Sequence, residues 1–238
     1  MIFEPWMIYT YNRCPILFHL GKDSSPSFGR ILHSTMVDLA KICVQDYQNP
    51  PTVNFVLDTW NKAWTLQGKP PYTRKRFDEL TNSGTRIILA YNTWLATLSK
   101  PHTGFPIEAG GYRMIPLAPD LYAKVPIDLV TSKGTLYTFS VTGSGLRENL
   151  FYSAYAISQK WADMIWDGPH IVLDPLIHCK TIAKLKAKKE DAAYKIRLTE
   201  YLKGIKAAAE QEIIVGRKTQ GCQECTTCDG LWYRHRSR

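Results

Sequence analysis

The chain has 238 residues, of which 45% are hydrophobic and 12% aromatic, so it can bury a substantial core and is not disordered by composition. Lysine and arginine total 30 against 21 acidic residues, and the resulting net charge of +9 favours an anionic partner such as nucleic acid. Many basic proteins have no such partner, so the charge alone does not define a function.

The sequence also predicts where the protein works. No apolar run approaches the roughly 20 residues that a membrane span needs, which excludes a membrane partner of that kind. The start of the chain lacks the basic segment and apolar core of a secretory signal. Six irregularly spaced cysteines do not resemble a disulfide scaffold. We therefore expect an intracellular protein, cytoplasmic or nucleoid-associated, and not a secreted one.

The first half of the chain is predicted to be helical. Residues 1–30 contain three prolines and predict a loop-rich start. Apolar residues at helical spacing predict helices over residues 31–47 and 54–66, each followed by prolines. A third helix is expected over residues 73–98, with a break near Gly84. We interpret residues 31–100 as a helical insertion.

The second half mixes strands and helices. Runs rich in strand-forming residues predict strands over 106–117, 123–130 and 135–141, with a hairpin turn at residues 132–134. A helix over 147–166, a strand over 170–177 and a long basic amphipathic helix over 181–211 follow. The order predicts one α+β or mixed α/β domain over 1–238, with its core sheet and helix in 106–178.

A cysteine cluster lies in the C-terminal segment, residues 212–238. Cys222, Cys225 and Cys228 are spaced so that a turn can direct the thiolates at one zinc ion or iron–sulfur cluster. Free surface thiols are the alternative. Three thiolates leave such a site one ligand short, and the candidates for the fourth ligand are Cys14, Cys43 and Cys179. Cys43 and Cys179 lie in apolar patterns and are predicted to be core residues.

Two further residues suggest a site. Asp128 lies in an apolar strand, where a buried acid needs a partner or a metal ion. His33 lies near a helix start, where a histidine is either structural or a ligand. The long basic helix and the tail "WYRHRSR" could contact nucleic acid through charge and stacking. The alternatives are a solvated helix face and an unstructured tail.

Together these segments resemble the RecB-type branch of the PD-(D/E)XK nucleases, which includes helicase–nuclease subunits and CRISPR adaptation exonucleases with an iron–sulfur cluster. The segments that carry the resemblance are "IYTYNRCPILFHL", "FGRILHSTM", "VPIDLVTSKGTLYTFSVTG", "NLFYSAYAIS" and the closing cysteines. The resemblance implies a restriction-endonuclease-like core. It implies that Cys14 joins Cys222, Cys225 and Cys228 around a 4Fe-4S cluster, and that His33 and Asp128 are ligands of manganese or magnesium.

The sequence departs from the family motif at the remaining catalytic positions. The second acid falls on Ser140 and the catalytic lysine on Thr142. In the next helix Tyr155 matches, but Phe151 replaces a glutamine, and Val125 replaces the glycine before the first acid. With one carboxylate and one imidazole, a hard cation should be held weakly.

We therefore expect a catalytically impaired, DNA-binding relative that binds single strands or ends. It would belong to a replication, recombination or repair assembly with a helicase or recombination protein. The first alternative is an active metal-dependent DNA exonuclease whose catalytic residues have migrated: Glu108 or Glu148 as the acid, Lys124 or Lys133 as the lysine. The second alternative is a zinc-binding interaction module that does not bind DNA.

Overall fold

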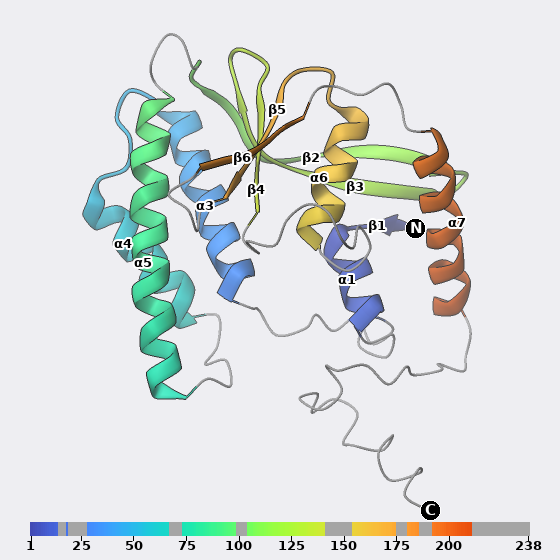
Figure 1. Ribbon diagram of the computed structural model, residues 1–238, viewed down its shortest axis with the longest axis horizontal. Coiled ribbons are helices and arrows are strands. Elements are labelled where there is room, and N and C mark those ends of the chain that lie inside the picture. The colour runs from blue at the N-terminus through green and yellow to red at the C-terminus, as the bar shows by residue number, and fades with distance from the viewer. Residues whose placement is uncertain are drawn as a thin grey trace, which may run out of the picture.

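The fold, seen in a computed structural model, combines one mixed β-sheet with helices (Figure 1). The structure describes residues 1–13, 18, 28–66, 73–98, 104–140, 154–174, 180–185 and 192–210. The strands are β1 (Ile2–Phe3), β2 (Pro106–Ala118), β3 (Leu121–Thr131), β4 (Leu136–Phe139), β5 (His170–Asp174) and β6 (Lys180–Leu185). The helices are α1 (Pro5–Arg13), α3 (Phe28–Gln45), α4 (Val53–Leu66), α5 (Arg74–Thr97), α6 (Ala154–Ile165) and α7 (Ala192–Ala209).

In the described part of the chain the sheet has six strands, in the order β1-β3-β4-β5-β6, with β2 paired to β3 as well. Strands β2, β3 and β4 are antiparallel neighbours, whereas β5 runs parallel to β4 and β6 antiparallel to β5. The short strand β1 runs parallel to β3. This arrangement confirms a mixed α+β fold in which a sheet is accompanied by helices.

Two apolar clusters hold the helices to the sheet. In the first, α3, α4 and α5 pack against side chains of β3, β4 and β5, including Leu129, Phe139 and Leu173. In the second, residues of α1, α6 and α7 pack against β3, including Ala123, Val125 and Ile127. Figure 1 shows these two helix groups beside different parts of the sheet, with α3 and α6 nearest to its middle.

Several predicted elements are confirmed, including the helices that became α3 and α4 and the strands β2, β3, β4 and β5. The predicted hairpin turn is also present, because the Gly134 amide donates to the Thr131 carbonyl oxygen at 2.8 Å and Gly134 has a φ of 72°. A left-handed φ of this kind favours glycine.

Three predictions are wrong. The long helix expected from residue 181 begins only at Ala192, because Lys180–Leu185 forms β6 and pairs with β5. Pairing with a neighbouring strand overrides the helix preference of a Lys- and Ala-rich segment. Residues 1–13 are not a loop but form β1 and α1, and Pro5 occupies the first helical position, where its missing N–H costs nothing.

The third wrong prediction is the break in α5, which runs without interruption through Gly84. A Cβ atom at Gly84 would lie 2.0 Å from Cζ2 of the buried Trp60. The glycine therefore permits close contact between α4 and α5 and does not end the helix. None of the helices in the described part of the chain is long and apolar enough to cross a membrane.

Candidate functional site

His33 and Asp128 form the centre of the site. His33 Nε2 lies 3.1 Å from Asp128 Oδ1, and the side chains are 17% and 7% exposed. The other Asp128 oxygen, Oδ2, accepts a hydrogen bond of 2.9 Å from the backbone N–H of Phe139. The sequence predicts that a buried Asp128 needs a partner, and the structure provides two: His33 of α3 and the Phe139 N–H of β4.

The close approach of α3 to the sheet explains how His33 reaches Asp128. His33, Val37 and Lys41 are spaced four residues apart and therefore share one face of α3. Gly110 of β2 lies against this face: a Cβ atom there would be 2.2 Å from Cε of Lys41 and 2.9 Å from Cγ1 of Val37. Strand β2 is paired with β3, so the contact also sets the distance between α3 and Asp128.

The other predicted motif positions are only partly described. Ser140 directly follows β4, is buried, and donates its backbone N–H to the Leu173 carbonyl oxygen at 2.8 Å. It therefore lies one residue from the Asp128 contact at Phe139, but it offers a hydroxyl and no carboxylate. Tyr155 lies in α6. Thr142 falls outside the described residues, as do Cys14, Cys222, Cys225 and Cys228.

A divalent cation finds only part of its ligand set here. Two ligands at about 2.1 Å from one metal ion and at right angles are about 3.0 Å apart, so the spacing of His33 and Asp128 suits either a hydrogen bond or a shared ion. Within the described ranges, however, no three His, Cys, Asp or Glu side chains converge. The described residues thus offer two ligands, which by themselves fit magnesium or manganese poorly, since these ions prefer six.

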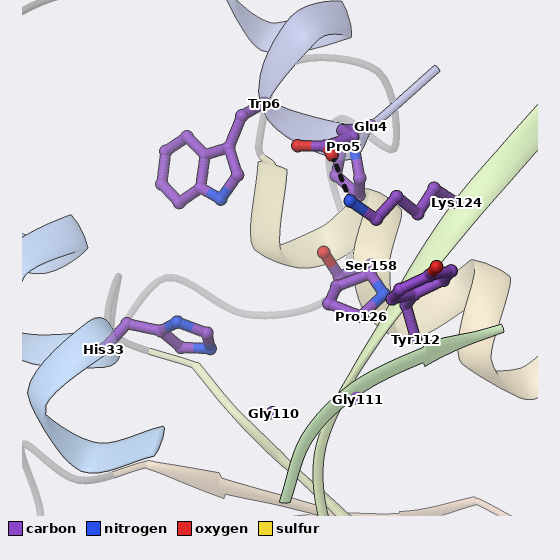
Figure 2. Close-up of a pocket in the computed structure, with 10 residues that line it drawn as sticks. All are labelled: Glu4, Pro5, Trp6, His33, Gly110, Gly111, Tyr112, Lys124, Pro126 and Ser158. Carbon is purple, nitrogen blue, oxygen red and sulfur yellow. Dashed lines mark hydrogen bonds and ion pairs between the residues drawn. The ribbon is translucent and has the colours of Figure 1, made fainter. Parts of the chain in front are cut away.

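The structure also has a pocket beside His33, which the sequence did not predict. It has a volume of about 230 Å³ and is bounded by α1 and the preceding Glu4, by α3, by β2 and β3, and by α6 (Figure 2). Its walls are formed by Glu4, Pro5, Trp6, His33, Gly110, Gly111, Tyr112, Lys124, Pro126 and Ser158.

Strand pairing brings the distant residues of this pocket together. Ile2 is opposite Tyr122 and Phe3 opposite Ala123 in the parallel β1–β3 pair, so the next residues, Glu4 and Lys124, become neighbours. Lys124 Nζ lies 2.7 Å from Glu4 Oε1, and this hydrogen bond raises the pKa of the ammonium group. The same Nζ lies 4.8 Å from the ring centroid of Tyr112. No local pattern reveals such a site, because the register between separate strands creates it.

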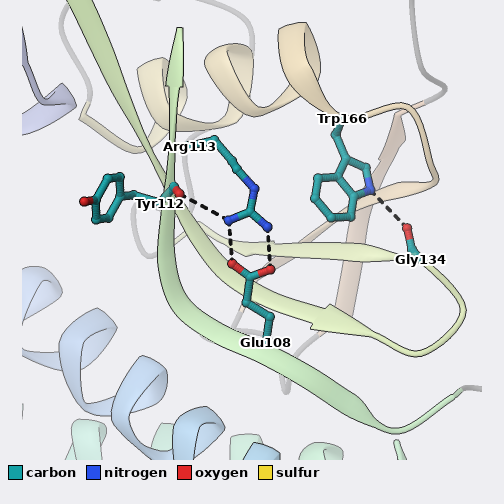
Figure 3. A network of polar contacts seen from close by, with 5 residues as sticks. All are labelled: Glu108, Tyr112, Arg113, Gly134 and Trp166. Carbon is teal, nitrogen blue, oxygen red and sulfur yellow. Dashed lines mark hydrogen bonds and ion pairs between the residues drawn. The ribbon is translucent and has the colours of Figure 1, made fainter.

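Two of the residues predicted as migrated catalytic groups have salt-bridge partners. Both oxygens of Glu108 accept from the Arg113 guanidinium, at 2.7 and 2.6 Å (Figure 3). Lys124 is paired with Glu4. Lys133 lies in the β3–β4 turn, and Glu148 falls outside the described residues. Figure 3 also shows Trp166 Nε1 donating to the Gly134 carbonyl oxygen at 3.0 Å, which ties the segment after α6 to this turn.

Cys43 is a core residue, as the sequence predicts. It is 2% exposed within the cluster of α3, α4 and α5, and burial raises the pKa of its thiol to about 11. Metal ligation requires a thiolate, so this environment disfavours Cys43 as the fourth ligand of a cysteine cluster. Cys179, the other cysteine predicted to be buried, falls outside the described residues.

Neither a protein-family model nor a curated protein sequence matches this chain. The function must therefore be argued from the site itself.

Proposed function

We propose that this chain is a DNA-binding protein of the RecB-like nuclease type whose catalytic centre is impaired. The observation that carries the proposal is the contact between His33 and Asp128, at 3.1 Å, beside a strand end that holds Ser140. Two of the residues that keep the family pattern, His33 and Asp128, are adjacent, whereas Ser140, at the position of the second acid, has no carboxylate.

The chemistry of phosphodiester hydrolysis supports the proposal that the catalytic centre is impaired. The reaction needs a divalent ion to stabilise charge on the phosphate and to activate water. His33 and Asp128 could supply two ligands to such an ion, and in the structure these two side chains contact each other. Losing one charge-stabilising group typically costs about 10²–10³ in rate, and grouped losses do not simply add. A site without the second acid and the lysine should retain little turnover.

The net charge of +9 supports DNA as the partner. In this proposal the protein binds single strands or DNA ends within a replication, recombination or repair assembly, together with a helicase or recombination protein. Binding through basic side chains releases counterions, so affinity for labelled single-stranded DNA should fall steeply as salt rises. A fluorescence anisotropy titration at several salt concentrations measures this. No affinity at low salt would favour the zinc-binding interaction module instead.

An active exonuclease remains the second candidate because one observation favours it: Glu4 and Lys124 line the same pocket as His33. A carboxylate and a lysine could there replace the two missing groups. The test is turnover of end-labelled single-stranded DNA with manganese. If the catalytic centre is impaired, the parent protein should show no more turnover than the Asp128→Ala variant. Turnover that disappears in both Asp128→Ala and Glu4→Gln would establish the migrated site.

A further inference from the structure

We infer that the pocket beside His33 holds one nucleotide of a single strand, with its base against the rings of Trp6 and Tyr112. This inference rests on the proposed DNA-binding function and names the part of the surface that contacts a base.

Rings dominate the walls of the pocket. Three of them are the planar aromatic rings of Trp6, Tyr112 and His33, and the puckered rings of Pro5 and Pro126 add apolar surface. Figure 2 shows the indole of Trp6 above the imidazole of His33, with Pro126 and Tyr112 across the space from them. Flat walls suit a flat ligand, and every nucleobase offers a face for stacking.

The polar groups exclude a purely apolar ligand. Glu4, Lys124 and Ser158 also line the space, so both hydrogen-bond donors and acceptors face it. A lipid chain would remove water from the Glu4–Lys124 pair and offer no hydrogen bonds in its place, which is energetically costly. A nucleobase carries donors and acceptors on its edges and can match such groups.

Size and charge point to a single nucleotide. A volume of about 230 Å³ is below the usual range of drug-sized pockets, about 300–1,000 Å³, and so favours one small ring-containing group. Two cations lie near the rings: Lys124 Nζ is 4.8 Å from the Tyr112 centroid, and the Arg30 guanidinium carbon is 5.2 Å from the Trp6 centroid. Glu4 partly balances the charge of Lys124, so attraction of the phosphates that flank a stacked base comes from Lys124 and Arg30 together.

Tyr112 provides the cleanest test because it is 56% exposed, so its replacement should leave the fold intact. The probe is a short fluorescein-labelled oligothymidylate at low salt, and circular dichroism checks the fold of each variant. We expect Tyr112→Ala to weaken binding by about tenfold, since stacking of one base is typically worth about 5- to 150-fold in affinity. Tyr112→Phe keeps the ring and should stay within about twofold of the parent protein. Phe55→Ala is the matched control, because Phe55 is an exposed aromatic residue of α4 that does not line the pocket.

A second variant, Trp6→Leu, tests the opposite wall and should also lose affinity. The inference is overturned if Tyr112→Ala and a folded Trp6→Leu both bind like the parent, a result that leaves the proposed DNA binding intact. If Trp6→Leu does not fold, Tyr112→Ala decides alone. If the parent protein itself does not bind the oligonucleotide, the proposed function fails and the pocket inference fails with it.

Discussion

At the scale of single residues, Asp128 supports the fold whether or not a metal ion is bound. Its two oxygens contact the Phe139 N–H at 2.9 Å and His33 Nε2 at 3.1 Å. Asp128→Ala would leave a buried backbone N–H without its acceptor, so we expect the free energy of unfolding to fall by about 1–3 kcal/mol. Asp128→Asn keeps one acceptor oxygen and should lose less. Urea denaturation measures both effects.

The control for Asp128 is Asp38, which is 54% exposed and forms a surface pair with Lys41. Asp38→Ala should change the free energy of unfolding by about 0.5 kcal/mol or less. Equal losses for Asp38→Ala and Asp128→Ala would contradict the structural role of the Asp128 contacts.

Cys43 gives a pH dependence with a defined sign. Burial raises the pKa of its thiol to about 11 in the folded protein, from 9.0 for an ordinary cysteine thiol. As pH rises through 9, the unfolded chain releases this proton first, so the contribution of Cys43 to stability is complete below pH 9 and is lost between pH 9 and about 11. Denaturation at successive pH values should show a shallower decline in Cys43→Ala. An unchanged decline would indicate that other groups, such as Tyr137, whose pKa burial also raises, cause it.

At the scale of elements, the sequence predicts what local patterns determine. Helices α3 and α4 carry apolar residues at helical spacing, and Gly134 marks the β3–β4 turn, so these elements are predictable. Strand β6 is not, because its Lys- and Ala-rich segment favours a helix and becomes a strand only by pairing with β5, the preceding strand. Strand β1 is not, because it depends on the distant strand β3 for its hydrogen bonds. The same reason hides the pocket. His33 and Asp128 were predictable as candidates, but their neighbour Lys124 gains its setting only from the pairing of β1 with β3.

Helix α5 offers a paired test of how glycine acts within a helix. A Cβ atom at Gly84 would collide with the fully buried Trp60, whereas a Cβ atom at Gly204 of α7 would meet no atom within 4 Å. Gly84→Ala should therefore destabilise the protein by about 1–3 kcal/mol through overpacking. Gly204→Ala should stabilise it by about 0.5–1 kcal/mol, since alanine favours the helix. Thermal melts of the two variants should shift in opposite directions, and a stabilised Gly84→Ala would contradict the α4–α5 contact.

At the scale of the whole molecule, the N-terminal segment is bound to distant parts of the chain. Strand β1 pairs with β3, Glu4 forms its ion pair with Lys124, and the Tyr201 hydroxyl of α7 donates to Asn12 Oδ1 of α1. These contacts hold the N-terminal segment to both β3 and α7. The predicted cysteine cluster would add a metal-bridged link between distant segments, joining Cys14 after α1 to cysteines that follow α7.

That link yields the last prediction. If Cys14 shares one metal centre with Cys222, Cys225 and Cys228, Cys14→Ser should lower both the metal content and the melting temperature, because the bound metal closes a very long loop. Elemental analysis and the visible absorption of anaerobically purified protein would distinguish zinc from an iron–sulfur cluster. Cys43→Ser is the control: it places a hydroxyl in the core where Cys43 is 2% exposed, so it should lower the melting temperature but keep the metal. Full metal content together with an unchanged melting temperature in Cys14→Ser would exclude the shared centre.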